Sequence, residues 1–174
     1  MKSLLNQQQI ELTIKRLANQ ILENNVQLEN TVLIGIQPRG IFLSDRIVKE
    51  LALLVDSKKI QYGRLDITFY RDDVRNELHV PNQTDIRFSI ERKKVILIDD
   101  VLYTGRTIRA ALDALMDFGR PEKVELMILI DRRYSRQLPI QPDYTGKSID
   151  SIVTQKVKVL WKGRDEKDEV ILID

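Results

Sequence analysis

The chain has 174 residues, of which 43% are hydrophobic and 31% charged, and its formal net charge is only +2. This length suits one domain with a sizeable core, and the small net charge argues against a polycation that binds nucleic acid over its whole surface. The absence of cysteine excludes disulfides, cysteine-based zinc sites and a thiol nucleophile. No apolar run resembles a signal peptide or reaches transmembrane length, which predicts a cytoplasmic protein with no membrane partner.

The first half of the chain alternates helical and strand-like patterns. Apolar residues spaced three and four apart predict an amphipathic helix over 10–22, and the run TVLIGI at 31–36 predicts a buried strand. Helical spacing returns over 41–55, and the alternation in LDITFY at 65–70 predicts a strand with one wetter face. Residues 71–88 are charged, contain a proline and show no sustained period, so we expect a long loop or a hairpin of weak strands.

The second half begins with another continuous apolar strand pattern, KVILI at 94–98. A helix is predicted over 108–115, with a stop at Gly119 and a proline beyond it. The run KVELMILI at 123–130 predicts a third buried strand. After residue 148, an alternating run and an apolar run flank the charged stretch KGRDEKDE, which predicts a strand pair joined by a turn.

Together these elements predict an α/β fold with a central, mostly parallel, twisted sheet and helices on both faces. The chain contains no internal repeat and no low-complexity segment, so we expect one domain over 1–174. Within it, we expect 71–88 to form a flexible lid loop. Residues from about 149 to 174 are expected to form a small hood or edge subdomain.

Two adjacent acids, Asp99 and Asp100, follow the apolar strand at 94–98 and precede the sequence T-G-R-T at 104–107. In parallel sheets, ligands bind outside the carboxyl ends of the strands, where these acids are expected. Neighbouring strand residues point to opposite sides, so both carboxylates reach one ligand only if the chain turns there, and we expect the following loop to supply that turn. The loop then starts a helix, whose free N–H groups and positive dipole end favour a phosphate.

A sugar phosphate satisfies both halves of this motif. The two carboxylates accept hydrogen bonds from ribose hydroxyls, and the loop holds the 5′-phosphate, with Gly105 allowing close approach and Thr104 and Thr107 adding hydroxyl donors. A helix cap in a solvated loop explains one threonine, but not a buried strand that delivers two acids. Receiver domains also pair aspartates, but at their first strand, whereas two helices and two strands precede this pair. The sequence therefore favours a sugar phosphate.

At these residues the sequence resembles the type I phosphoribosyltransferases, whose diphosphate-sugar motif is an apolar strand, two acids and a T-G-[KR]-T loop. Further segments resemble the PyrR family, pyrimidine operon attenuators that are also uracil phosphoribosyltransferases: GIQPRG, DITFYRDD, ALDALMDFGRP and DRRYSRQLPIQPDYTGK. The resemblance covers nearly the whole chain and is weakest in 1–30, 71–90 and after 148. It implies the type I phosphoribosyltransferase fold and conversion of uracil and phosphoribosyl diphosphate into UMP and pyrophosphate, with Mg²⁺ as cofactor.

The resemblance also implies which residues act. Catalysis would fall to Arg39, Asp99 and Asp100, with both acids meeting Mg²⁺ through sugar hydroxyls or water. Binding of phosphoribosyl diphosphate and UMP would fall to a larger set: Arg39, Gly40, Asp99, Asp100, Leu102, Tyr103, Thr104, Gly105, Arg106 and Thr107. From the lid, Arg71 and Arg75 would contact phosphate.

Purine enzymes of this superfamily carry an aspartate just before the T-G pair, where this chain has Tyr103, which agrees with uracil although a tyrosine can also simply pack. The base would lie under the hood, near Asp131, Arg132, Val159 and Trp161. A lone tryptophan on an alternating strand is also typical of a core residue, so both interpretations of Trp161 stay open.

PyrR proteins bind the leader mRNA of the pyr operon, with UMP or UTP as co-ligand, through a basic face across a dimer. The resemblance therefore predicts a homodimer or higher oligomer and RNA contacts from four residues: Lys15, Arg16, Arg136 and Lys156. Asn19, Asn24 and Gln141 stand where RNA-binding relatives tend to carry basic residues, which weakens this prediction. Two alternatives retain one half of the function: an RNA-binding nucleotide sensor without useful turnover, or an enzyme that has lost RNA binding.

Overall fold

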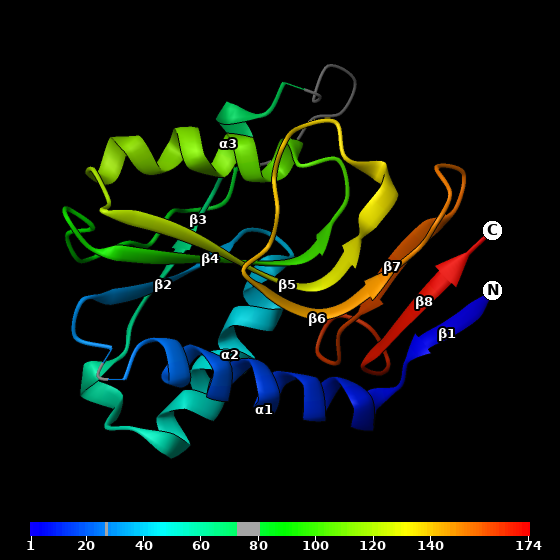
Figure 1. Ribbon diagram of the computed structural model, residues 1–174, viewed down its shortest axis with the longest axis horizontal. Coiled ribbons are helices and arrows are strands. Elements are labelled where there is room, and N and C mark those ends of the chain that lie inside the picture. Colours follow the sequence, from blue (N-terminus) through cyan, green and yellow to red (C-terminus); the bar gives the residue numbers. More distant parts are fainter. Residues whose placement is uncertain (27, 73–80) are drawn as a thin grey trace.

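The computed structural model describes residues 1–26, 28–72 and 81–174. Its main sheet has five parallel strands in the order β3-β2-β4-β5-β6. These strands are β2 (Thr31–Ile36), β3 (Gln61–Leu65), β4 (Lys94–Leu102), β5 (Lys123–Arg132) and β6 (Tyr144–Ile149). Figure 1 shows α1 (Gln7–Asn24) and α2 (Gly40–Leu54) on one face of this sheet and α3 (Arg106–Leu115) on the other. The predicted α/β class with helices on both faces is confirmed.

A second, antiparallel sheet forms the hood. It contains β1 (Lys2–Leu5), β8 (Glu169–Ile173) and β7 (Lys156–Leu160), in that order. In Figure 1 this sheet lies beside the end of the main sheet at which β4 and β5 finish, with both chain termini on its outer side. The predicted C-terminal strand pair is confirmed, but β1 was not predicted, so the hood also includes the start of the chain.

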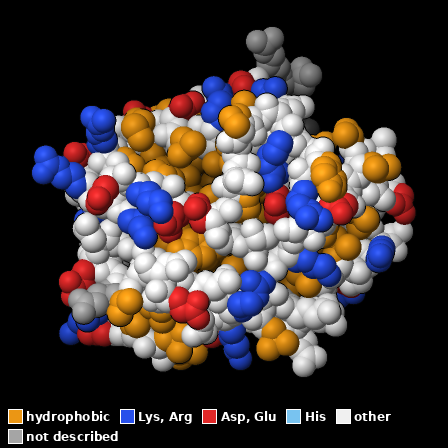
Figure 2. All heavy atoms as spheres, viewed as in Figure 1, with side chains coloured by type: hydrophobic (Ala, Val, Ile, Leu, Met, Phe, Trp, Pro, Cys, Tyr) orange, Lys and Arg blue, Asp and Glu red, His pale blue; other side chains and the backbone are white. Residues whose placement is uncertain are grey.

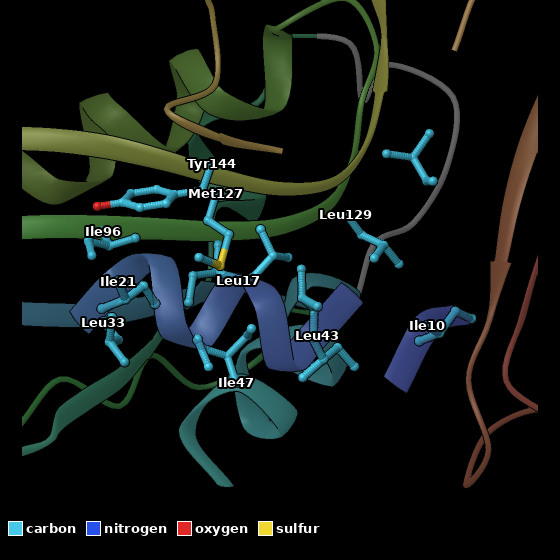
Figure 3. Packing of buried hydrophobic residues seen from close by; sticks show 14 of the residues in the cluster. Ile10, Leu17, Ile21, Leu33, Leu43, Ile47, Ile96, Met127, Leu129 and Tyr144 are labelled. Carbon is cyan, nitrogen blue, oxygen red and sulfur yellow. The ribbon is translucent and has the colours of Figure 1, made fainter. Parts of the chain in front are cut away.

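Apolar side chains from both helical layers meet the main sheet in its interior. All six residues of β2 are buried, as expected for a strand covered on both faces. Figure 3 shows Leu17 and Ile21 of α1 facing Leu43 and Ile47 of α2, beneath strand residues of the sheet. The helical spacing that predicted α1 and α2 therefore marks the faces that pack. No helix in the described ranges is both long and apolar enough to cross a membrane.

The prediction of a strand at 65–70 is wrong. The strand β3 ends at Leu65, and Thr68–Tyr70 forms a turn of 3₁₀ helix. The Asp66 carboxylate causes this change, because its Oδ1 accepts from Thr68 Oγ1 at 2.8 Å and from Thr68 N at 3.4 Å. Such side-chain bonds to the local backbone compete with a strand ladder.

The strand β6 was also not predicted, because its sequence YTGKSI lacks an apolar or alternating pattern. It pairs with β5 at the edge of the sheet, and α1 packs near it. A Cβ on Gly146 would lie 2.4 Å from the Leu129 carbonyl oxygen and 2.9 Å from Thr13 Cγ2. The glycine therefore permits an approach that no other residue allows, and tertiary contacts rather than propensity make this segment a strand.

Candidate functional site

Residues at the ends of β2 and β4, and in the segments that follow β2 and β3, line a pocket of about 270 Å³, here called the acidic pocket. Ile36 is the last residue of β2 and residues 37–39 follow it, Ile67, Thr68 and Arg71 follow β3, and residues 99–101 belong to β4. Carboxyl ends of neighbouring parallel strands share one edge of a sheet, which is why segments far apart in the sequence meet here. The structure therefore brings Arg39, Asp99 and Asp100 together.

Both acids are almost inaccessible, with 6% of Asp99 and 5% of Asp100 exposed. The expected turn directly after them is not present, because β4 continues to Leu102. Instead, Asp99 Oδ1 accepts from the backbone N–H of Asp100 at 2.8 Å, and both residues border the acidic pocket. Two carboxylates thus reach one pocket from within a strand.

Burial raises the pKa of the Asp99 carboxyl well above its usual range, and the neighbouring charge of Asp100 raises it further. Burial also raises the pKa of Asp100, while the Arg39 guanidinium opposes that shift. Ionising these two buried carboxyls therefore lowers the stability of the fold. A ligand that brings hydroxyl donors and positive charge would stabilise the ionised pair.

Arg39 joins three parts of the fold at this pocket. Its Nε lies 3.0 Å from Asp100 Oδ2, and its Nη2 donates to the carbonyl oxygen of Val159 in the hood. The next residue, Gly40, begins α2, and a Cβ there would lie 2.5 Å from the Ile98 carbonyl oxygen. Gly40 therefore lets the start of α2 approach β4 closely, which places Arg39 beside the acids.

A second pocket of about 320 Å³, here called the loop pocket, is lined by residues 101–108 and Arg71. Gly105 has φ 94° and precedes α3, whose first N–H groups have no partner within the helix. Thr104, Gly105, Arg106 and Thr107 all border this pocket, and so does Leu102, although only 1% of Leu102 is exposed and it belongs to the core. The prediction that the T-G-R-T segment begins a helix is confirmed.

Two side chains outside the motif hold Arg106. Asp72 Oδ2 lies 2.9 Å from Arg106 Nη1, and Gln137 Oε1 accepts from Arg106 Nε at 2.8 Å. The adjacent Arg71 borders both pockets. The predicted lid contact Arg75 lies outside the described residues. Neither Asp72 nor Gln137 was singled out from the sequence, because only the fold brings them beside α3.

The four residues predicted to lie near the base make different contacts, and Arg132 contacts a residue that lines the loop pocket. Arg132 donates to Ser151 Oγ at 2.8 Å and to the carbonyl oxygens of Ile152 and Gln155, and its guanidinium lies 4.0 Å from the centre of the Tyr103 ring. Burial lowers the pKa of this guanidinium. Arg132 thus joins the loop pocket to the hood.

Asp131 forms an ion pair with Arg136 and does not border the acidic pocket. Val159 and Trp161 are 1% and 0% exposed, and the Trp161 ring packs against Phe42 and the Arg46 guanidinium. Of the two interpretations of Trp161 that the sequence left open, this burial supports the core residue and not a place beside the base.

The four basic residues predicted to contact RNA do not form one exposed group. Lys15, Arg16 and Lys156 are exposed, and Arg16 also donates to the carbonyl oxygens of Thr145 and Gly146. Figure 2 shows basic and acidic side chains interspersed on the face in view. Arg136 is turned inward, and only 19% of its side chain is exposed. The prediction of Arg136 as an RNA contact is therefore wrong, because its donors serve the interior.

Residues 1–162 match the family model of the phosphoribosyl transferase domain. A relative from Bacillus cereus (strain AH820), named Bifunctional protein PyrR, is 43% identical over 174 aligned residues, which cover 98% of this chain and 96% of the relative. A relative of the same name from Bacillus thuringiensis subsp. konkukian has the same identity and coverage.

Solved structures agree on the fold. A hypoxanthine phosphoribosyltransferase from Staphylococcus aureus superposes with a TM-score of 0.68 at 24% identity, over 87% of this chain and 79% of that one. The Trypanosoma cruzi hypoxanthine phosphoribosyl transferase gives a TM-score of 0.75 at 18% identity, over 99% and 91% of the two chains. The chain therefore belongs to the phosphoribosyltransferases, and among them to the PyrR family.

Proposed function

We propose that the protein is a uracil phosphoribosyltransferase that converts uracil and phosphoribosyl diphosphate into UMP and pyrophosphate. One observation carries this proposal: the acidic pocket and the loop pocket share Arg71, Val101 and Thr107 in their walls. One substrate that has a polyol at its centre and phosphates at both ends can occupy both pockets. The relatives named Bifunctional protein PyrR support the same assignment.

In this mechanism, Asp99 and Asp100 accept hydrogen bonds from the two ribose hydroxyls. As the bond to pyrophosphate breaks, the ribose gains oxocarbenium character, and the nearby carboxylates favour that positive charge. Their burial strengthens the interaction, because few water molecules screen it. The T-G-R-T loop holds the 5′-phosphate through backbone N–H groups and the hydroxyls of Thr104 and Thr107.

The leaving pyrophosphate carries negative charge and needs donors on the other side of the ribose. Arg39, with Gly40 at the start of α2, supplies a guanidinium and helix N–H groups there. Arg71 adds a second cation at the boundary of the two pockets. Closure of 71–88 as a lid over the diphosphate would exclude water, and this role of the segment is part of the proposal.

Mg²⁺ is the expected cofactor. In the described ranges, no group of three or more acidic, histidine or cysteine side chains could hold a metal ion by itself. Asp99 and Asp100 fit a site in which the metal is held mainly by substrate phosphates, sugar hydroxyls and water, as is usual for Mg²⁺. When bound, the ion would neutralise charge on the diphosphate.

For the base, we propose a pyrimidine beneath the hood. Tyr103 stands where purine enzymes carry an aspartate, and its ring is stacked with Arg132, so no carboxylate is offered at that position. Asp131 and Arg132 remain the proposed neighbours of uracil. Val159 contributes through its backbone, since its carbonyl oxygen accepts from Arg39.

We also propose that the protein binds pyr operon leader mRNA, with UMP or UTP as co-ligand, and thereby attenuates transcription. PyrR membership favours this second activity, and Lys15, Arg16 and Lys156 remain its proposed contacts. We further propose that the protein forms a homodimer or higher oligomer, that residues 1–174 are a single domain, and that it acts in the cytoplasm. The alternatives are an RNA-binding sensor without useful turnover and an enzyme without RNA binding.

The deciding experiment measures pyrophosphate release from phosphoribosyl diphosphate and Mg²⁺ with uracil, hypoxanthine or guanine. Release with uracil alone supports the proposed enzyme, and release with a purine contradicts the base assignment. If folded protein that still binds UMP releases no pyrophosphate with any base, the alternative of an RNA-binding sensor without useful turnover is supported. Filter binding of leader RNA with and without UMP separates the bifunctional protein from an enzyme alone.

A further inference from the structure

We propose that Arg136 is a positioning residue that shapes the loop pocket for a sugar 5′-phosphate, which rests on the proposed function of that pocket. The segment after β5 returns past the N-terminal end of α3, as the yellow-to-orange loop in Figure 1 shows. Arg136 lies in this return segment. Its side chain reaches back to the strand ends and away from solvent.

The guanidinium of Arg136 meets five acceptors. Nε donates to one carbonyl oxygen, Nη1 to three, and Nη2 to a carboxylate: Ile140 O at 2.9 Å, Leu102 O at 3.4 Å, Tyr103 O at 2.7 Å, Arg132 O at 3.1 Å and Asp131 Oδ1. The carboxylate balances its charge. Every donor atom of the planar fork is therefore used inside the protein.

Neighbouring residues extend this support. The backbone N–H groups of Gln137 and Leu138 donate to the Thr104 carbonyl oxygen at 3.0 and 3.3 Å. A Cβ on Gly105 would lie 3.2 Å from Ile140 Cδ1 and 3.4 Å from Leu138 Cβ, so the same segment packs against the glycine. Carbonyl groups of three successive residues, 102–104, are thus held from one side.

This arrangement determines where the loop's N–H groups point. In a trans peptide, the carbonyl of one residue and the N–H of the next point in opposite directions. Fixing the carbonyls of residues 102–104 toward the return segment therefore directs the N–H groups of Tyr103, Thr104 and Gly105 away from it. A phosphate in the loop pocket would meet donors that are oriented before it arrives.

Arginine is required for this task because its geometry, and not only its charge, meets the acceptors. Lysine has the same charge but a single ammonium, which cannot reach the loop carbonyls and those of Arg132 and Ile140 at the same time. The substitution Arg136→Lys therefore removes the geometry and keeps the charge. Arg133→Lys is the matched control, since Arg133 pairs with Asp150 at 2.7 Å on the surface.

The test compares two ligands by calorimetry, ribose 5-phosphate and Mg²⁺-pyrophosphate, on the full chain. In Arg136→Lys, we expect the Kd of ribose 5-phosphate to rise about 10- to 100-fold, the size of effect that small displacements in a site produce. The Kd of pyrophosphate should stay within about twofold, because that ligand uses the Arg39 side of the site. Arg133→Lys should change neither.

Equal losses for both ligands in Arg136→Lys would show a general structural role and overturn the inference, as would unchanged binding of ribose 5-phosphate. If that variant folds poorly, Asp131→Asn loosens Arg136 less and should raise only the Kd of ribose 5-phosphate, a ligand without a base. No selective rise in that variant also overturns it. Wild-type protein that does not bind ribose 5-phosphate instead contradicts the proposed function of the pocket.

Discussion

The two ends of the main sheet both bury acids, but they treat them in opposite ways. At the carboxyl end, Asp99 and Asp100 lie near Arg39, which is itself partly exposed, and the charge of Arg71 also acts on Asp99. At the amino end, Glu125 of β5 accepts from the Tyr144 hydroxyl at 2.9 Å and pairs with Lys123 at 2.8 Å and Lys94 at 3.3 Å.

These surroundings shift the acids in opposite directions. Burial raises the pKa values of Asp99 and Asp100. Burial also acts to raise the pKa of Glu125, but the hydrogen bonds from Lys123, Tyr144 and Lys94 outweigh it, and the net shift is downward. The contrast teaches that a buried acid whose hydrogen bonds outweigh burial stabilises the fold, whereas a buried acid for which burial outweighs them gains more from a ligand.

If the acids at the carboxyl end serve a ligand, removing one of them should mainly reduce turnover, and this is the largest effect we expect. Asp100→Asn should lower kcat by about 100-fold or more, because it removes charge that favours the developing oxocarbenium ion. We expect the fold to stay intact, with an unchanged circular dichroism spectrum. An Asp100→Asn protein with near wild-type pyrophosphate release would remove Asp100 from the mechanism.

At the amino end, the corresponding change should affect stability and not activity. Glu125→Gln should lower the free energy of unfolding by about 1–2 kcal/mol, because hydrogen bonds to a charged acceptor are lost. The pKa of Glu125 is lowered in the folded protein, so its contribution is present at neutral pH and is lost as the pH falls through that lowered value. Thermal unfolding at several pH values measures this. Glu122→Gln, at an exposed acid just before β5, is the control and should leave Tm nearly unchanged.

Asp99→Asn should have the opposite sign. Because the pKa of Asp99 is raised in the folded protein, ionisation opposes folding above that pKa, and asparagine removes this penalty. We expect the free energy of unfolding to rise by about 1 kcal/mol at pH 8, a gain typical of substitutions that remove a destabilising active-site group. It corresponds to a rise in Tm of about 2–4 °C.

The same gain should shrink as the pH falls through the raised pKa, since protonated Asp99 is as neutral as asparagine. A Tm difference between wild type and Asp99→Asn that does not depend on pH would contradict the assigned electrostatics. Loss of stability at every pH would show that Asp99 is structural, like Glu125.

The smallest effect concerns Asp72, which pairs with Arg106 at 2.9 Å and Arg109 at 3.4 Å at the loop pocket. These side chains are about two-fifths exposed, so the pairing contributes little. Asp72→Asn should raise the KM for phosphoribosyl diphosphate about two- to fivefold, with kcat preserved. Asp113→Asn removes the other carboxylate beside Arg109 and serves as the control. A change in kcat alone would assign Asp72 a different role.

Local pattern predicted much of this protein. The continuous apolar runs at 31–36, 94–98 and 123–130 are strands in the core of the sheet, because a strand buried on both faces has no polar side to show. The helix start at Gly105 and the neighbouring acids were also evident, since both belong to one short stretch. That stretch identified the expected class of ligand.

Elements without such a pattern were missed. The strand β6 depends on Gly146 fitting against β5, and β1 depends on pairing with β8 from the other end of the chain. A one-dimensional pattern does not contain these contacts. The alternation at 65–70 was misleading for a related reason. The Asp66 carboxylate accepts hydrogen bonds from the backbone N–H and the hydroxyl of Thr68, and the chain there forms a 3₁₀ turn.

The sequence by itself determined the alternation of strands and helices, the place of Asp99 and Asp100 at the end of a strand, and the family. Only the tertiary structure decided which polar residues serve which region. It buries Trp161 in the core, turns Arg136 inward, and distinguishes two acids whose pKa burial raises from one acid whose pKa its hydrogen bonds lower. The physical reason is that burial and the partners of a charge come from residues distant in the chain, and these set its pKa and its availability to a ligand.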